Sequence, residues 1–212
     1  MGQGLTGEML LAGYARGIFP MAESREDPTL YWVDPRQRGV IPLDGFHLSR
    51  SLARTIRRGG FRISTDTAFA AVVDGCAARD ETWINTPLRA LYDDLHAKGF
   101  AHSLEVWAGD QLIGGVFGIA LGGAFFGESM FSARRDASKI ALAYLVDRLR
   151  QTGFTLLDTQ FLTPHLASLG GVEIPRADYR RQLARALRQD ANFSAPAVPD
   201  AQSILQRMTQ TS

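Results

Sequence analysis

Two stretches, GGVFGIALGGAFFGESMFS (114–132) and LLDTQF (156–161), decide the fold of this chain. Both are apolar and aromatic, which predicts β-strands. They also carry polar side chains where Leu or Val would serve: Glu128 in the first stretch, and Asp158 and Gln160 in the second. Burying a carboxylate costs several kcal/mol unless it is paired or hydrogen-bonded. If both strands belong to one sheet, the three residues indicate a polar pocket; Glu128 alone would equally fit an ion pair at a sheet edge.

Length and composition describe an ordinary globular protein. The 212 residues, 45% hydrophobic and 21% charged, can hold one domain, or one domain plus a small one. No stretch approaches the roughly 18 apolar residues that span a membrane, and the N-terminus does not resemble a signal peptide. We therefore expect a cytoplasmic protein that does not bind membranes. The single Cys76 excludes an internal disulfide and is expected to be a buried thiol.

The order of elements indicates an α/β (α+β) fold. Periodicity and turn residues predict helices at 5–16, 47–58, 67–78, 88–98, 136–152 and 177–189, and strands at 61–66, within 102–131 (three) and at 154–161. We divide the chain into a small N-terminal domain with a basic helix (1–60), a catalytic domain (61–190) and a loose C-terminal tail (191–212). A crossover helix after antiparallel strands suits acyltransferases of the GNAT type.

Such acyltransferases bind coenzyme A through a glycine-rich turn between the central strand and the following helix. The corresponding stretch here, FSARRDASK (131–139), contains no glycine. This argues against an enzyme that uses an acyl-CoA. The chain also lacks CxxC, HExxH, Gly-x-Ser-x-Gly and P-loop motifs, and its four histidines are scattered. We therefore expect neither a metal nor a cofactor.

Arginine dominates the basic residues: of 23, only Lys98 and Lys139 are lysines. A GC-rich genome produces the same bias, so the placement of the arginines matters more than their number. The helix at 47–58 carries three of them opposite its apolar side, namely Arg50, Arg54 and Arg57. They form either a solvated face or a stripe that follows a phosphate backbone. The last predicted helix likewise holds Arg180, Arg181, Arg185 and Arg188 mainly off its apolar side.

Many segments together resemble the leucyl/phenylalanyl-tRNA–protein transferases. The matching stretches are YARGIFP (14–20), YWVDPR (31–36), GCA with ETWI (75–84), HSLEVW (102–107), GGVFG (114–118), FFGESMFS (125–132), ASK (137–139), LLDTQF (156–161) and HLASLGGVEIPR (165–176). They cover most of residues 10–185 in the order of the family, and several are long and specific.

The resemblance implies a leucyltransferase that moves Leu or Phe from aminoacyl-tRNA to an N-terminal Arg or Lys of an acceptor protein, marking it for N-end rule degradation. We expect Met to be transferred less well, because apolar pockets discriminate weakly. The family combines a small N-terminal domain with a GNAT-like catalytic domain and uses no metal or coenzyme A. Its partners are aminoacyl-tRNA, here a substrate, and acceptor proteins. We expect a monomer.

The resemblance also assigns roles to residues. Asp158 would draw the proton, Gln160 would sit at the reacting amine and ester, and Glu128 would orient the amine or bind the cationic end of the peptide. The aminoacyl pocket would comprise Val116, Phe125, Gly127, Ser129, Met130, Leu142, Leu145 and Leu157, although such residues also suit an ordinary core. Phe19 and Trp83 would contact the terminal adenosine, and the tRNA backbone would meet Lys139, Arg50, Arg54 and Arg57.

The chain departs from its relatives in a few places. Met21 stands where many have Trp, and Thr163 stands where some have Asn. The N-terminal region is shorter than in many relatives. Three alternatives stay open: an acyl-CoA-dependent N-acyltransferase, a non-catalytic tRNA-binding protein, and a transferase that delivers amino acids to a peptidoglycan amine.

Overall fold

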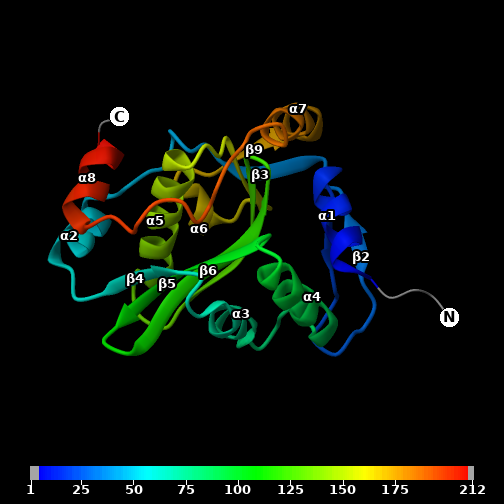
Figure 1. Cartoon of the computed structure of the whole chain (residues 1–212), viewed down its shortest axis with the longest axis horizontal. Helices are drawn as coiled ribbons and strands as arrows, with labels where there is room; N and C mark the ends of the chain where they lie inside the picture. The colour runs from blue at the N-terminus through cyan, green and yellow to red at the C-terminus, as the bar shows by residue number, and fades with distance from the viewer. Residues whose placement is uncertain (1–4, 210–212) are drawn as a thin grey trace.

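A computed structural model describes residues 5–209 as a mixed sheet with helices on both faces (Figure 1). Seven strands run in the order β4-β5-β6-β7-β8-β3-β9. Their bounds are β3 (Gln37–Ile41), β4 (Arg62–Thr65), β5 (Ala101–Ala108), β6 (Gln111–Leu121), β7 (Ala124–Ser132), β8 (Leu156–Gln160) and β9 (Val172–Pro175). A separate antiparallel ribbon is formed by β1 (Phe19–Met21) and β2 (Tyr31–Val33). The predicted mixed α/β class is confirmed.

The centre of the sheet is an antiparallel run of β5, β6 and β7, as predicted. Gly109 and Gly122 lie in the two turns with φ of 58° and 55°, a left-handed conformation that favours glycine. The helix α5 (Ala137–Gln151) then crosses over, so that β8 pairs parallel with β7. This crossover brings the two polar strand ends, 127–130 and 157–160, to the same side of the sheet.

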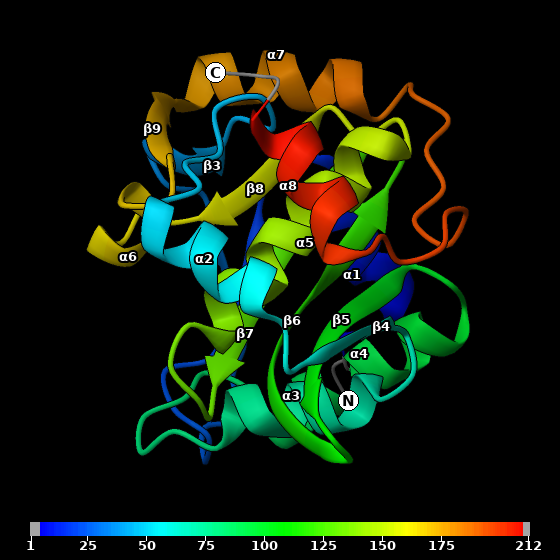
Figure 2. The same ribbon diagram turned by 90° about the vertical axis from the view of Figure 1, so that its left-hand side faces the viewer.

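Two hydrophobic cores lie on opposite faces of the sheet, because successive strand residues point to opposite sides. Phe125 and Leu157 join one core, whereas Phe126 and Leu156 join the other. The first core is covered by α5, α2 (Arg50–Arg58) and α8 (Ala201–Thr209), which stand in front of the sheet in Figure 2. The second is covered by α1 (Gly7–Ala15), α3 (Phe69–Ala77), α4 (Thr86–Ala97) and α7 (Arg176–Ala186).

Three further features concern helices α6, α3 and α2. The one-turn helix α6 (Pro164–Ala167) follows β8. Cys76 on α3 is buried, as predicted. The amphipathic character of α2 is also confirmed, with Leu52 and Ile56 buried. No helix within residues 5–209 has the length and apolar composition needed to cross a membrane.

The structure departs from the predicted domain boundary at residue 60. Strand β3 lies inside the main sheet, paired with β8 on one side and β9 on the other. Helix α2 adds Leu52 and Ile56 to the first core and contacts α5. Residues 37–58 therefore belong to the same layers as the segment after residue 60. The sequence did not indicate that β3 belongs to the main sheet, because the pattern of a five-residue strand does not show which distant strands it pairs with.

The C-terminal segment also differs from the loose tail that the sequence predicted. Arg148 donates to the carbonyl oxygens of Phe193 and Pro196, and the ring of Phe193 stacks on His102. Helix α8 is held by two hydrogen bonds from Arg207 to the carboxylate of Asp147, both 2.7 Å long. Tertiary contacts order this segment, although its own pattern is weak; residues 210–212 lie outside the described residues.

Candidate active site

A β-bulge on β7 directs the side chain of Glu128 into the site. Along the β6–β7 pair, Phe117 lies opposite Ser129 and Gly118 lies opposite Gly127, so Glu128 is the extra residue on β7. A bulge of this kind re-aims a side chain and often occurs next to an active site. Glycine is required opposite the bulge, because a Cβ atom at Gly118 would collide with the carbonyl oxygen of Phe126. The glycine-rich sequence thus creates the local geometry that turns Glu128 inward.

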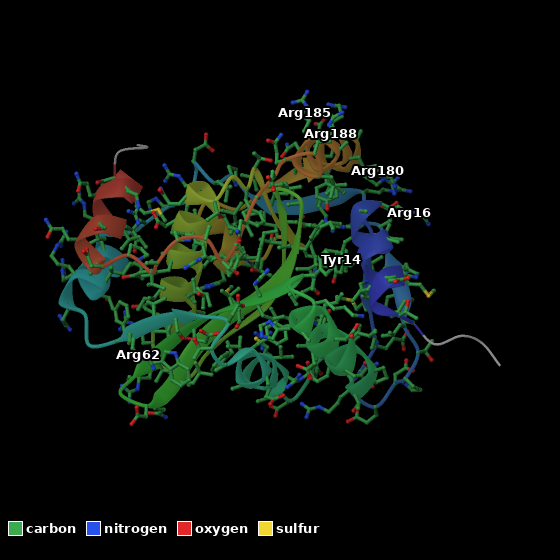
Figure 3. All side chains as sticks on the ribbon, viewed as in Figure 1. Tyr14, Arg16, Arg62, Arg180, Arg185 and Arg188 are labelled. Atoms are coloured by element: carbon green, nitrogen blue, oxygen red, sulfur yellow. The ribbon has the colours of Figure 1, made fainter. Side chains whose placement is uncertain are left out.

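Three donors surround the buried Glu128 carboxylate. Tyr14 donates to Oε1 at 2.7 Å, Gln160 donates its amide to Oε1 at 3.0 Å, and Tyr92 donates to Oε2 at 2.8 Å. Figure 3 shows Tyr14 pointing from α1 toward the sheet. Burial is the main effect on Glu128 and raises its pKa to about 7; the three hydrogen bonds limit the rise. The carboxylate can therefore exchange a proton near neutral pH.

The two tyrosines serve as donors only. Burial, and then the neighbouring charge of Glu128, raises the pKa of both Tyr14 and Tyr92 well above the usual value. Both hydroxyl groups therefore stay protonated and point at the carboxylate. Because α1 and α4 each supply one of them, the position of Glu128 depends on two helices that pack over the second core.

Asp158 is fully buried and all its acceptor positions are used. Arg38 forms a bidentate ion pair with it, from Nε to Oδ1 at 2.9 Å and from Nη2 to Oδ2 at 2.6 Å. Tyr179 donates to Oδ2 at 2.6 Å, and the backbone N–H of Gln160 donates to Oδ1 at 2.8 Å. Asp158 does not line the cavity described below. This geometry does not favour the predicted role of Asp158 as the group that draws the proton.

Gln160 ends β8 in an unusual conformation. Its φ of 64° lies in the left-handed region, which costs a non-glycine residue roughly 1 kcal/mol or more. The hydrogen bond from its N–H to Asp158 holds this conformation, and a second bulge places Thr159 as the extra residue opposite β3. Gly39 makes room, because a Cβ atom there would lie 2.6 Å from the carbonyl carbon of Phe161. The side chain of Gln160 can therefore reach both Glu128 and the cavity.

A cavity of about 390 Å³ opens beside Glu128 and Gln160. Its size suits a small ligand. Its wall includes seven of the eight residues predicted for the aminoacyl pocket, namely Val116, Gly127, Ser129, Met130, Leu142, Leu145 and Leu157. Phe125 is the exception: it is packed in the first core against Phe154 and Phe193 and does not line the cavity. Larger hollows near α1 and α8 contain none of the predicted catalytic residues.

The two residues predicted to contact the terminal adenosine, Trp83 and Phe19, lie in different surroundings. Trp83 lines the cavity, and so does Met21. Phe19 does not: it is 1% exposed, lies beneath the guanidinium of Arg38 and packs edge-on against Phe161. A ring covered in this way offers no free face for a base, so this geometry does not favour the predicted role of Phe19.

The predicted backbone contacts lie on the surface. Arg50, Arg54 and Arg57 are exposed on α2, and Lys139 lies 3.5 Å from Asp136 at the start of α5. Thr163 and His165 also line the cavity.

Sequence reasoning missed the residues that support the carboxylates, chiefly Tyr14, Tyr92, Arg38 and Tyr179. The available signal was indirect. A buried tyrosine hydroxyl needs a partner, and Tyr14 occurs in one of the stretches that carry the resemblance. Nothing in the sequence, however, indicated that Arg38 would lie beside Asp158, 120 residues away along the chain.

Comparisons with known proteins agree on one family. A family model described as leucyl/phenylalanyl-tRNA protein transferase matches residues 40–184, and one described as its N-terminal domain matches residues 4–36. Leucyl/phenylalanyl-tRNA–protein transferases are 68% identical in Ruegeria pomeroyi (97% of this chain, 98% of that protein), 59% in Roseobacter denitrificans (98% and 99%) and 58% in Paracoccus denitrificans (100% of both).

A solved structure of L-PGS from Bacillus licheniformis has a TM-score of 0.42 at 14% identity, covering 76% of this chain and 55% of that one. This likeness is too weak to assign a common fold. The GNAT-like architecture therefore stays a prediction.

Glu128 should make stability depend on pH. Its pKa is about 7 in the folded protein against 4.5 as the ordinary value. Between these values the folded protein retains a proton that the unfolded chain has lost, so stability is highest below pH 4.5 and falls as pH rises through 7. Relative to Glu128→Gln, we expect the wild-type free energy of unfolding to drop by about 3 kcal/mol between pH 4.5 and 8. Urea denaturation at both pH values measures this, and a pH-independent difference would contradict it.

Proposed function

The chain belongs to the leucyl/phenylalanyl-tRNA–protein transferase family, and on that premise we propose that it moves leucine or phenylalanine from tRNA to the N-terminal Arg or Lys of an acceptor protein. The observation that carries this proposal is the cavity itself. It is largely apolar, and its polar end holds a carboxylate with a pKa near neutrality. We further propose that the product is marked for degradation and that the catalytic domain is GNAT-like.

The donor needs little activation. The amino acid is esterified to the ribose of the terminal adenosine, and an ester is already reactive toward amines. The nucleophile is an α-amino group with a pKa of about 7.7–8.0, of which roughly a tenth is neutral at pH 7. The enzyme must therefore position the two groups, accept the proton of the amine and stabilise the developing oxyanion.

Glu128 is the best candidate for the proton acceptor. It lines the cavity, and its pKa near 7 suits general-base catalysis at neutral pH. The amine nitrogen attacks the ester carbonyl carbon, Glu128 takes a proton from that nitrogen, and the ester C–O bond to ribose breaks. The proton then passes to the departing ribose oxygen. Tyr14 and Tyr92 hold the carboxylate in place throughout.

Gln160 and Asp158 play supporting roles in this mechanism. The Gln160 amide donates to Glu128, which leaves its carbonyl oxygen as an acceptor for an N–H of the incoming amine. Asp158 acts as a positioning residue, because it fixes the backbone of Gln160 and is itself saturated by Arg38 and Tyr179. This assignment reverses the roles that the resemblance implied for the two carboxylates.

The apolar wall suits Leu and Phe. Met130, Leu142 and Leu145 provide a lining without charge, and the unbranched Met130 can adapt to side chains of two shapes. A pocket of this kind discriminates by only about 1–3 kcal/mol per methylene. Transfer of Met at reduced efficiency is therefore part of the proposal.

The alternatives fit the geometry less well. At the start of α5, where coenzyme A would need free N–H groups, the N–H of Ser138 already donates to Ser132 Oγ and the carboxylate of Asp136 is close by. A non-catalytic tRNA-binding protein gives no reason for a strained Gln160 beside a buried Glu128. A transferase that acts on a peptidoglycan amine differs only in the acceptor, so the acceptor must be tested.

We expect labelled leucine to pass from leucyl-tRNA to a peptide that begins with Arg, and far less to the same peptide beginning with Ala. The reason is that the transferase must recognise a cationic N-terminal residue. Acid-precipitable label measures the transfer, and a cell-wall peptide amine serves as the third acceptor. Equal transfer to the Arg and Ala peptides would contradict the proposed acceptor class.

Replacement of Glu128 by Gln should slow single-turnover transfer by about 100-fold or more, because a general base is lost. The wild-type rate should rise with pH through about 7, and Glu128→Gln should lose that rise while keeping the one due to the amine. Asp158→Asn should slow transfer but keep both. A Glu128→Gln enzyme with the wild-type pH profile would remove Glu128 from the proposed role.

The arginines of α2 should make tRNA binding depend on salt. Triple replacement of Arg50, Arg54 and Arg57 by Ala should lower the slope of log affinity against log salt by about 2–3, since each phosphate contact contributes about 0.7–0.9. The matched control replaces Arg16, Arg185 and Arg188, which Figure 3 shows at the outer edge near α1 and α7. Filter binding at several salt concentrations measures the slopes; equal effects of both triples would refute a specific stripe.

A further inference from the structure

One cationic side chain in the cavity wall has no role in the mechanism above. Among the described residues that line the cavity, Arg79 is the one lysine or arginine. It follows α3, on the segment that also carries Trp83, and it is exposed at the rim. We propose that Arg79 binds the phosphate that joins the terminal adenosine of the tRNA to the preceding nucleotide. This inference rests on the proposed function and adds a binding residue to the same site.

The guanidinium of Arg79 is oriented by a hydrogen bond to strand β7. Its Nη2 donates to the carbonyl oxygen of Met130, two residues after Glu128 on β7, at 2.5 Å. One edge of the guanidinium is thus fixed to the pocket wall, which leaves its other donors for a ligand. A planar guanidinium with free donors matches two oxygens of a phosphate.

The backbone of this segment is held as well. Nη2 of Arg25 donates to the carbonyl oxygens of Ala77 and Arg79, at 2.5 and 3.0 Å. The backbone at Arg79 is therefore held in place by Arg25, although the side chain of Arg79 is exposed. A braced donor loses less conformational entropy when it binds a ligand than a freely moving side chain does.

The charge of Arg79 lacks a partner. The structure pairs Arg89 with Asp74 and Arg207 with Asp147, but within residues 5–209 it gives Arg79 no carboxylate. An unpaired cation at the rim attracts an anion, and it repels an acceptor peptide that begins with Arg or Lys. The wall with Arg79 and Trp83 therefore belongs to the donor, and the acceptor must approach from another side.

The chemistry of the donor explains why an anion is needed at this place. The ester must lie beside Glu128 and Gln160, with the side chain of the amino acid against the apolar wall. If adenine stacks on Trp83, the 5′-phosphate of the same nucleotide projects away from the ester, toward solvent. A phosphate avoids the apolar interior because desolvation of a charge is costly, so it stays at the rim, where Arg79 stands.

The test compares three leucyl donors that carry the same ester: leucyl-tRNA, 3′-leucyl-adenosine with a 5′-phosphate, and 3′-leucyl-adenosine without one. We expect Arg79→Ala to lower kcat/KM by about 10- to 100-fold for both donors that carry the phosphate, the range expected for a lost charged hydrogen bond. The donor without phosphate should change by less than about twofold. Arg79→Lys, which keeps the charge but loses the planar fork, should fall between wild type and Arg79→Ala.

The matched control is Arg62→Ala, which removes one exposed arginine from the edge strand β4, three strands away from β7 (Figure 3). It should leave all three donors unchanged. The inference is overturned if Arg79→Ala slows the donor without phosphate as much as the others, or slows none of them. Failure of the wild-type protein to transfer leucine from any donor would instead refute the proposed function. Comparable turnover of the donor without phosphate by Arg79→Ala and wild type also shows that the variant folds.

Discussion

The carboxylate of Glu128, buried among three hydrogen-bond donors, is the interaction on which the site depends. Desolvation of a carboxylate costs several kcal/mol, and each hydrogen bond to a charged group returns about 1.5–3 kcal/mol. Tyr14, Tyr92 and Gln160 therefore offset much of the cost without removing it, and the remainder appears as a pKa of about 7. Fewer donors would leave Glu128 protonated at neutral pH, and a nearby cation would leave it too weak as a base. The arginine Arg38 instead pairs with the neighbouring carboxylate of Asp158.

Asp158, the second buried carboxylate, does have a cation beside it, namely Arg38. Asp158 is buried even more completely than Glu128, and it has a bidentate guanidinium, a tyrosine hydroxyl and a backbone N–H around it. These donors use every acceptor position of Asp158, so its carboxylate holds its neighbours in place. Asp158 joins β3, β8 and α7, and it fixes the left-handed backbone of Gln160. Among the described residues, Asp158 thus has an arginine partner, Arg38, whereas the hydrogen-bond partners of Glu128 are two tyrosines and an amide.

Local patterns in the sequence predicted much of this arrangement, and their failures have identifiable causes. The central antiparallel strands, the crossover helix and α2 follow from periodicity and turn residues, and Glu128 and Gln160 were noticed because polar side chains interrupt apolar strands. The bulge at Glu128 was not foreseeable, because it depends on how β6 and β7 pair. The same limit explains Arg38, Tyr179 and the packing of α8. Phe19 and Phe125 lie outside the cavity lining, which the sequence could not indicate because an aromatic residue beside a pocket and one beneath it look alike in sequence.

In the proposed function, the placement of charge around the cavity orients the donor. Glu128 lies at the buried end, Arg79 lies at the exposed rim, and the wall between them is apolar. A donor that carries a phosphate at one end and an ester a few bonds away can satisfy both ends in only one orientation, with the ester inward. In the proposed function the acceptor has the opposite polarity, since its amine would reach Glu128 and its cationic side chain would avoid Arg79. In the proposed function, both substrates are oriented by two charged groups: Glu128 on β7, and Arg79, which donates to the carbonyl oxygen of Met130 on the same strand.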